Sequence, residues 1–308
     1  MNEIALEIKG LKKKYPTGFL LLKKSEVLRD IHINAYRGEI YSLIGHNGAG
    51  KTTTFKTVLG FVKPDSGEIT LFGEKIGLKQ KRKIGFLPER PYFYDYLTAR
   101  EYLIFTAGLF NLKQAEQKVD ELLELVDLKV NKNLRLRKFS KGMLQKLGIA
   151  QAIINDPDFL ILDEPLGGLD PIGRKNLKDI IIRLKEQGKT IIFSSHILQD
   201  AEAISDRVGI IVKGKTIKEG KLKDIIEESF KGIKVSVSGL KDIPEGIKYD
   251  KKSFEENILN VYFNNKDDAY KFIDYVVKNR GEIRLVEPIK KTLEEIFVEL
   301  KNENSDNK

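Results

Sequence analysis

The chain has 308 residues, of which 41% are hydrophobic, and its 54 Lys and Arg against 45 Asp and Glu give a formal net charge of +9. This length favours about two domains with sizeable cores, and the composition excludes a disordered or fibrous protein. The absence of cysteine excludes disulfides, thiolate metal sites and cysteine nucleophiles, and it is compatible with a cytosolic protein.

Neither a membrane-spanning helix nor a signal peptide is expected from the sequence. The longest runs without a charged residue, 40–50 and 102–112, are eleven residues long, whereas a spanning helix needs about 20 apolar residues. Glu3 and Glu7 do not fit the basic and then apolar order of a signal peptide. We therefore expect the protein to stay in the compartment where it is made.

Residues 39–212 alternate short apolar segments with amphipathic helices, the order typical of an α/β fold with a largely parallel sheet. The predicted strands span residues 39–44, 159–162, 190–194 and 208–212. Thr98 and Glu101 form a capping box that opens one predicted helix, and Asp170 followed by Pro171 caps another.

A different pattern begins near residue 230. Two alternating strands, 233–237 and 259–263, precede a helix over 269–277, a strand over 282–286 and a last helix capped by Thr292 with Glu295. The sequence thus predicts a first domain over residues 1–230, a small α+β domain over 231–301 and a polar tail over 302–308.

A phosphate-binding loop stands between the first of these strands and a helix expected near Thr52. The loop reads Gly45, His46, Asn47, Gly48, Ala49, Gly50, Lys51 and Thr52, followed by Thr53. Its glycines allow backbone N–H groups to converge on phosphate oxygens, while Lys51 reaches the terminal phosphates and Thr52 holds Mg²⁺. The motif predicts a nucleoside triphosphate ligand; the alternative is a glycine-rich turn with a solvated lysine.

Two carboxylates, Asp163 and Glu164, follow the buried strand 159–162. Asp163 is predicted to hold Mg²⁺, directly or through water, and Glu164 is the candidate general base for attack of water on the γ-phosphate. The alternative is that both lie at a solvated strand end without a catalytic role.

From about residue 15 to residue 220 the chain resembles the ATP-binding cassette (ABC) ATPases, with motifs in that family's order. Residues 84–89, ending at Glu89, resemble the Q-loop; 139–143 resemble the signature; 168–171 resemble the D-loop; and 194–196 end at a switch histidine, His196. Tyr15 stands where the family places an aromatic that stacks on adenine.

The resemblance implies a P-loop NTPase fold, with a helical subdomain and an N-terminal β subdomain, that binds ATP and Mg²⁺. It implies catalytic roles for Glu164, His196 and Lys51, and metal ligands at Thr52, Asp163 and Glu89. It further implies nucleotide contacts at the loop residues from Gly45 to Thr53 and at Tyr15, Glu89, Ser140, Lys141, Gly142 and Asp170.

Several of these residues have structural alternatives. Ser140 opens a helix and could serve only as its N-cap, His196 could be a structural histidine, and Tyr15 could be a packing aromatic. The sequence also departs from the family at two positions, since Glu89 replaces the usual glutamine and Lys141 a glycine. Both variants resemble the family's bacterial export branch.

In this family two cassettes face each other, and the signature of one completes the ATP site of the other. The resemblance therefore implies a second cassette as partner, together with separate permease subunits that hold the protein at the cytoplasmic face of the membrane. Residues 90–96, rich in aromatics, are predicted to dock on those subunits, with core packing as the alternative. Two alternatives to a transporter ATPase are a soluble ABC protein of translation or DNA repair and an ATP-binding module without useful hydrolysis.

The positive charge is unevenly distributed. Residues 231–308 carry 15 basic and 15 acidic residues, so the excess belongs to residues 1–230. Within these, 9–24 and 129–146 contain no acidic residue and adjoin the proposed adenine contact and the signature. We therefore attribute the charge to local fields beside an ATP site and expect no nucleic acid partner; solvated lysine faces are the alternative.

Overall fold

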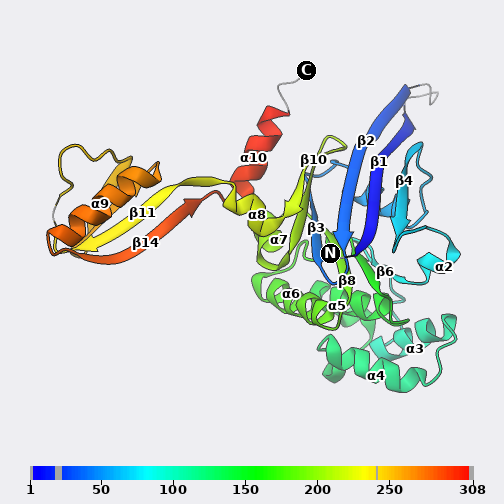
Figure 1. Ribbon diagram of the computed structural model, residues 1–308. Helices are drawn as coiled ribbons and strands as arrows, with labels where there is room; N and C mark the ends of the chain where they lie inside the picture. Colours follow the sequence, from blue (N-terminus) through cyan, green and yellow to red (C-terminus); the bar gives the residue numbers. More distant parts are fainter. Residues whose placement is uncertain (1–2, 18–22, 241, 305–308) are drawn as a thin grey trace. The chain divides into compact units, whose positions relative to one another are not determined.

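The computed structural model describes residues 3–17, 23–240 and 242–304. The chain forms two compact units, Met1–Leu222 and Lys223–Lys308 (Figure 1). The division falls before residue 230 because β10, the last strand of the large sheet, ends at Lys221. The change of sequence pattern near residue 230 instead marks β11, which begins at Phe230.

A ten-stranded sheet forms the first unit, in the order β5-β4-β1-β2-β10-β9-β3-β8-β7-β6. Its strands are β1 (Ile4–Thr17), β2 (Lys23–Tyr36), β3 (Ile40–Ile44), β4 (Ser66–Leu71), β5 (Glu74–Lys75), β6 (Ile84–Leu87), β7 (Phe159–Leu162), β8 (Thr190–Ser195), β9 (Arg207–Val212) and β10 (Lys215–Lys221). The five strands β9, β3, β8, β7 and β6 are parallel to one another. The predicted α/β organisation with a largely parallel core is confirmed.

The four strands predicted between residues 39 and 212 are found within one residue of their predicted ends, as β3, β7, β8 and β9. They could be recognised because they are buried on both faces and therefore read as continuous apolar runs. The long antiparallel hairpin of β1 and β2 was not predicted strand by strand. Register shifts interrupt its pairing, so its polar and apolar residues do not alternate regularly.

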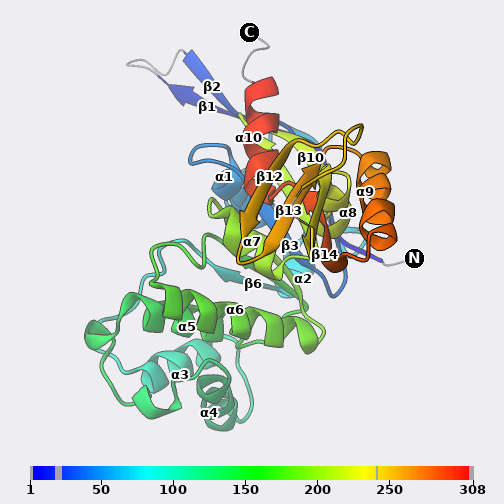
Figure 2. The ribbon, with the colours of Figure 1, turned by 90° about the vertical axis from the view of Figure 1, so that its left-hand side faces the viewer.

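Helices cover the parallel strands and form a separate group beside them. They are α1 (Lys51–Val58), α2 (Leu78–Lys81), α3 (Ala99–Leu109), α4 (Ala115–Leu125), α5 (Lys141–Ala152), α6 (Pro171–Glu186) and α7 (Leu198–Ile204), with short 3₁₀ turns at Lys129–Asn131 and Leu136–Lys138. Figure 2 shows α3 and α4 grouped against α5. The capping box of Thr98 with Glu101 and the N-cap at Asp170 are confirmed.

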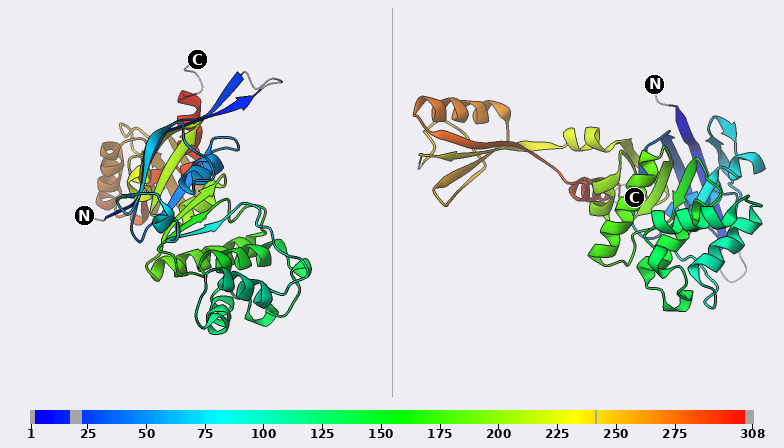
Figure 3. Two further views of the ribbon diagram at one scale, coloured as in Figure 1. Left: turned by 90° about the vertical axis from the view of Figure 1, so that its right-hand side faces the viewer. Right: turned by 90° about the horizontal axis from the view of Figure 1, so that it is seen from below.

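The second unit is a four-stranded antiparallel sheet with a helix on one face. Its elements are α8 (Leu222–Glu227), β11 (Phe230–Ser238), β12 (Lys251–Glu255), β13 (Ile258–Phe263), α9 (Lys266–Lys278), β14 (Glu282–Lys290) and α10 (Leu293–Glu303), with strand order β12-β13-β11-β14. Figure 3 shows α9 lying along the sheet. The predicted cap of Thr292 with Glu295 is confirmed, and α10 continues to Glu303, inside the segment predicted as a tail.

Within the described residues, no helix combines the length and apolar character required to cross a bilayer.

Alternating strand residues and one face of α9 form the core of the second unit. Phe272 is fully buried and packs against Phe263, with ring centroids 5.4 Å apart. Phe272→Ala should lower the free energy of unfolding of this unit by about 3–5 kcal/mol. We expect an earlier thermal transition in the full chain, whereas Tyr270→Ala, on the exposed face of the same helix, should change it little. Equal melting of the two variants would contradict this packing.

Candidate functional site

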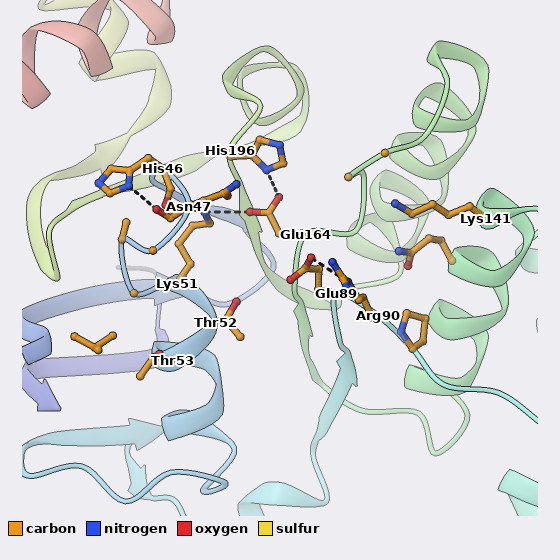
Figure 4. A pocket seen from close by; sticks show the side chains of 18 of the residues that line it. His46, Asn47, Lys51, Thr52, Thr53, Glu89, Arg90, Lys141, Glu164 and His196 are labelled. Carbon is orange, nitrogen blue, oxygen red and sulfur yellow. Dashed lines mark hydrogen bonds and ion pairs between the residues drawn. The ribbon is translucent and has the colours of Figure 1, made fainter. Parts of the chain in front are cut away.

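A cavity of about 770 Å³ lies at the carboxyl ends of the parallel strands (Figure 4). Leu162 pairs with both Leu87 and Phe193, so β6, β7 and β8 end side by side. The residues that follow these strands therefore meet at one edge of the sheet, where open α/β sheets bind ligands. The described residues that line the cavity are Val27, His46 to Thr53, Glu89, Arg90, Pro91, Lys141, Leu144, Gln145, Glu164, Gly167, Gly168 and His196.

The loop predicted to bind phosphate connects β3 to α1, as expected, and α1 begins at Lys51. The path of the loop requires glycine, as Gly50 and Gly45 illustrate. Gly50 has φ +111°, a left-handed conformation that disfavours side chains, and a Cβ on Gly45 would lie 2.7 Å from the carbonyl oxygen of Ile211. The loop is therefore shaped by backbone geometry, with its N–H groups at the start of a helix, where anions bind.

Lys51 is buried beneath this loop and donates a hydrogen bond to the carbonyl oxygen of Gly45 at 2.7 Å. Its Nζ also lies 3.1 Å from Oε1 of Glu164. The other carboxylate oxygen, Oε2, lies 2.7 Å from Nδ1 of His196. An ionised carboxylate only accepts hydrogen bonds, so Nδ1 is the donor. Glu164 thus contacts both of the other residues predicted to be catalytic, Lys51 and His196 (Figure 4).

Asp163 lies behind Glu164 and is almost completely buried. Its Oδ1 accepts hydrogen bonds from Ser194 Oγ at 2.7 Å and from Thr52 Oγ1 at 3.2 Å. Burial raises the pKa of the Asp163 carboxyl, the two hydrogen bonds partly oppose this shift, and the nearby charges of Glu164 and Glu89 reinforce it. The adjacent carboxylate and hydroxyl oxygens fit the preference of Mg²⁺ for oxygen ligands.

Glu89, the third predicted metal ligand, also lines the cavity, but its side chain is half exposed. Its Oε1 lies 3.7 Å from Nε of Arg90. Within the part of the chain that the structure describes, no three or more acidic, histidine or cysteine side chains gather as a metal-binding group. A metal held by Thr52 and Asp163 would therefore draw further ligands from water and nucleotide oxygens, with Glu89 as a further candidate in the same cavity.

Tyr15 and the predicted site residues of the signature and D-loop differ in their position relative to the cavity. Tyr15 pairs with Ser25 in the hairpin and is not among the described lining residues. Ser140 and Asp170 are exposed N-caps of α5 and α6, so Ser140 does cap its helix, while the idea that capping is its sole role stays a prediction. Lys141 lines the cavity of its own chain, whereas Gly142, beside it, does not. Roles of these residues toward a second chain stay predictions.

Ser194 and Gln145 are among the residues of the site that had no role assigned from the sequence. Ser194 was part of the switch motif, but its contact with Asp163 depends on the register of β7 and β8. Gln145 is buried and lines the cavity, and its Oε1 has no hydrogen-bond partner in the described part of the chain. Gln145 follows Lys141 by four residues on the same face of α5, and this spacing was the signal in the sequence that could have placed it at the site.

Comparisons with known proteins show which family the chain resembles. The family model described as "ABC transporter" matches residues 28–167. The chain is 38% identical to the uncharacterized ABC transporter ATP-binding protein sll0415 of Synechocystis, over 94% of this chain and 82% of the relative. It is 47% identical to the bacitracin transport ATP-binding protein BcrA of Bacillus licheniformis, over 61% and 63%. Among solved structures, the dimeric bacterial ABC transporter cassette MJ0796 matches with TM-score 0.63 and 25% identity, over 70% of this chain and 98% of that one.

The raised pKa of Asp163 predicts a cost in stability. Because burial lifts this pKa above its ordinary value of 3.8, the ionised carboxylate destabilises the folded state at neutral pH, and the cost disappears as the pH falls below that value. Asp163→Asn keeps an Oδ1 acceptor for Ser194 and Thr52 but removes the charge. Without metal at pH 7, it should raise the melting temperature by roughly a few degrees.

The difference between Asp163→Asn and wild type should narrow as the pH falls toward 4. Asp170→Asn is the matched control, since asparagine caps a helix about as well as aspartate, and it should leave the melting temperature unchanged. A lower melting temperature for Asp163→Asn at pH 7 would contradict the inferred cost of the buried charge.

Proposed function

Because this chain belongs to the ABC transporter family, we propose that two such cassettes hydrolyse Mg²⁺-bound ATP together and thereby drive export through separate membrane subunits. The chain is an ATP-binding and ATP-hydrolysing subunit of an ABC transporter with a P-loop NTPase fold. Relatives named as transport proteins favour this role over the soluble alternative in translation or DNA repair.

The contact of Glu164 with both Lys51 and His196, directly beside the phosphate loop, carries this proposal. An anionic phosphate entering the loop competes with Glu164 for Lys51, because Lys51 is the buried cation at the loop. Glu164 then keeps its contact with His196 and has one oxygen available to accept the proton of the attacking water. In this way nucleotide binding and release of the base are coupled.

Thr52 and Asp163 are proposed to hold Mg²⁺, since their oxygens lie 3.2 Å apart at the mouth of the loop. When bound, the metal neutralises charge on the phosphates. The chain's own part is to keep both oxygens in place, and the hydrogen bonds that Asp163 accepts do this. Glu89 is a further candidate ligand, because it lines the same cavity.

The second cassette is proposed to approach the exposed end of α5. Ser140 and Lys141 stand at the N-terminus of this helix, where free N–H groups and a lysine favour a phosphate. Ser140 is an exposed N-cap, and this exposure supports a contact with a second chain. The dimeric state of the structural relative supports the same arrangement.

An aromatic patch supports docking to membrane subunits. It consists of Tyr92, Tyr94, Tyr96 and Phe105, which are between 42% and 85% exposed and are linked by ring contacts of 5.9 to 6.3 Å. Phe93, within the same segment, is instead buried against Tyr102, so core packing applies to this ring alone. Exposed aromatic clusters mark interaction surfaces. Docking through this patch places the protein at the cytoplasmic face of the membrane.

Glu164→Gln tests the proposed base. The amide keeps the shape of the side chain but cannot take up the proton, so phosphate release should fall by at least about a hundredfold. ATP binding should persist, and the variant should accumulate as a dimer when ATP is added, as measured by light scattering. Glu256→Gln, in the second unit, is the control and should hydrolyse ATP at the wild-type rate. Normal turnover by Glu164→Gln would exclude Glu164 as the base.

The aromatic patch is tested with a double variant, Tyr92→Ala and Tyr96→Ala. Because both rings are exposed, folding and basal ATPase activity should remain. When the variant is co-expressed with a candidate multi-spanning membrane subunit that co-purifies with wild type, that co-purification should be lost. The control is Tyr249→Ala with Tyr270→Ala, two exposed tyrosines of the second unit, and its co-purification should equal that of wild type. Retention of the membrane subunits by the first variant would argue against docking at this patch.

A further inference from the structure

We propose that Ser194 is a positioning residue whose single hydroxyl sets both the metal-binding carboxylate Asp163 and the backbone of Glu164. The proposal rests on the proposed roles of these two acidic residues. It assigns to Ser194 an effect on metal affinity and on turnover, without any contact with nucleotide.

The hydroxyl of Ser194 connects the two residues directly. Its Oγ donates to Asp163 Oδ1 at 2.7 Å and accepts from the backbone N–H of Glu164 at 2.8 Å. Serine can do both at once, because a hydroxyl is a donor and an acceptor. Ser194 is itself fully buried in β8, so water cannot readily replace it in either hydrogen bond.

Glu164 needs such a support because its backbone is in an unfavourable conformation. Its φ is +49°, in the left-handed region that residues other than glycine seldom adopt. Such a conformation persists only where the surroundings hold it. The preceding N–H, that of Asp163, is held by the carbonyl oxygen of Leu87 at 2.8 Å, and that of Glu164 is held by Ser194. The chain thus turns at Glu164 under the control of β6 on one side and β8 on the other.

Two other serines of the same sheet provide matched controls. Ser195 follows Ser194 on β8, but its hydroxyl bonds to the backbone of Ile197 at 2.9 and 3.0 Å. Ser42, on the neighbouring strand β3, is buried, and its hydroxyl has no hydrogen-bond partner among the residues that the structure describes. Removing the hydroxyl at these positions therefore alters the sheet in a comparable way while leaving both contacts of Ser194 intact.

Within the described residues, loss of the Ser194 hydroxyl would leave the Asp163 carboxylate with the Thr52 hydrogen bond alone and would remove the side-chain acceptor of the Glu164 N–H. Residues that orient a metal ligand typically contribute tenfold to a hundredfold to metal affinity or activity. For Ser194→Ala we expect at least tenfold weaker binding of Mn²⁺ together with a non-hydrolysable ATP analogue, measured by electron paramagnetic resonance. The value of kcat should also fall, and KM for Mg²⁺-bound ATP should rise by up to a similar factor, because metal and nucleotide bind together.

Binding of the same analogue in EDTA should be unchanged in Ser194→Ala, because Ser194 does not line the nucleotide cavity within the described residues. Ser194→Thr and Ser194→Val form an isosteric pair that differs in the hydroxyl. Ser194→Thr should retain Mn²⁺ affinity and turnover far better than Ser194→Val, even if the added methyl group lowers the stability of both variants. Ser195→Ala and Ser42→Ala should bind Mn²⁺ as wild type does.

The proposal is overturned if Ser194→Ala binds Mn²⁺ and turns over within twofold of wild type. It is equally overturned if Ser194→Thr and Ser194→Val lose the same amount of Mn²⁺ affinity. The same holds if Ser42→Ala loses as much Mn²⁺ affinity as Ser194→Ala, since the hydroxyl contacts of Ser194 would then not be the cause. Failure of the proposed function would look different: wild type itself would neither bind Mn²⁺ with nucleotide nor hydrolyse ATP.

Discussion

The alignment of parallel strands at their carboxyl ends is the constraint on which the rest of the site depends. Pairing of Leu162 with Leu87 and with Phe193 brings three strand ends together, although β6 and β8 are far apart in sequence. The strands are buried on both faces, so a slip by one residue would exchange the side chains packed against the two faces and disrupt the packing of both, which is strongly disfavoured. The same packing that stabilises the sheet therefore positions Asp163, Glu164 and His196.

The site is formed at a cost to the fold. Asp163 is a carboxyl in surroundings that raise its pKa, and Glu164 has a left-handed backbone. Lys51 is a buried charge and Glu164 a partly buried one, and their ion pair offsets part of the cost of removing each from water. Unfavourable features of this kind concentrate where a site must hold groups ready for a ligand. Here the surrounding strands, with Ser194 between the two acidic residues, maintain them.

Much of the architecture could be predicted because its signals are local. The buried strands read as apolar runs, and Thr98 with Glu101 and Thr292 with Glu295 mark helix starts within four residues. The hairpin of β1 and β2 was harder to predict, since bulges break the alternation of its polar and apolar residues. Exposure within residues 90–96 was also undecided, because only packing separates the buried Phe93 from the exposed Tyr92.

By itself, the sequence determined the chemistry available to this protein: a phosphate loop after a strand, two carboxylates after another and a histidine after a third. These motifs can be recognised without a structure because each consists of residues that are close together in the sequence. Only the tertiary structure decided that Lys51 contacts Glu164, that Ser194 joins Asp163 to Glu164, and that Lys141 and Gln145 line the cavity. Such contacts depend on the register and packing of segments distant in sequence, which no local pattern encodes.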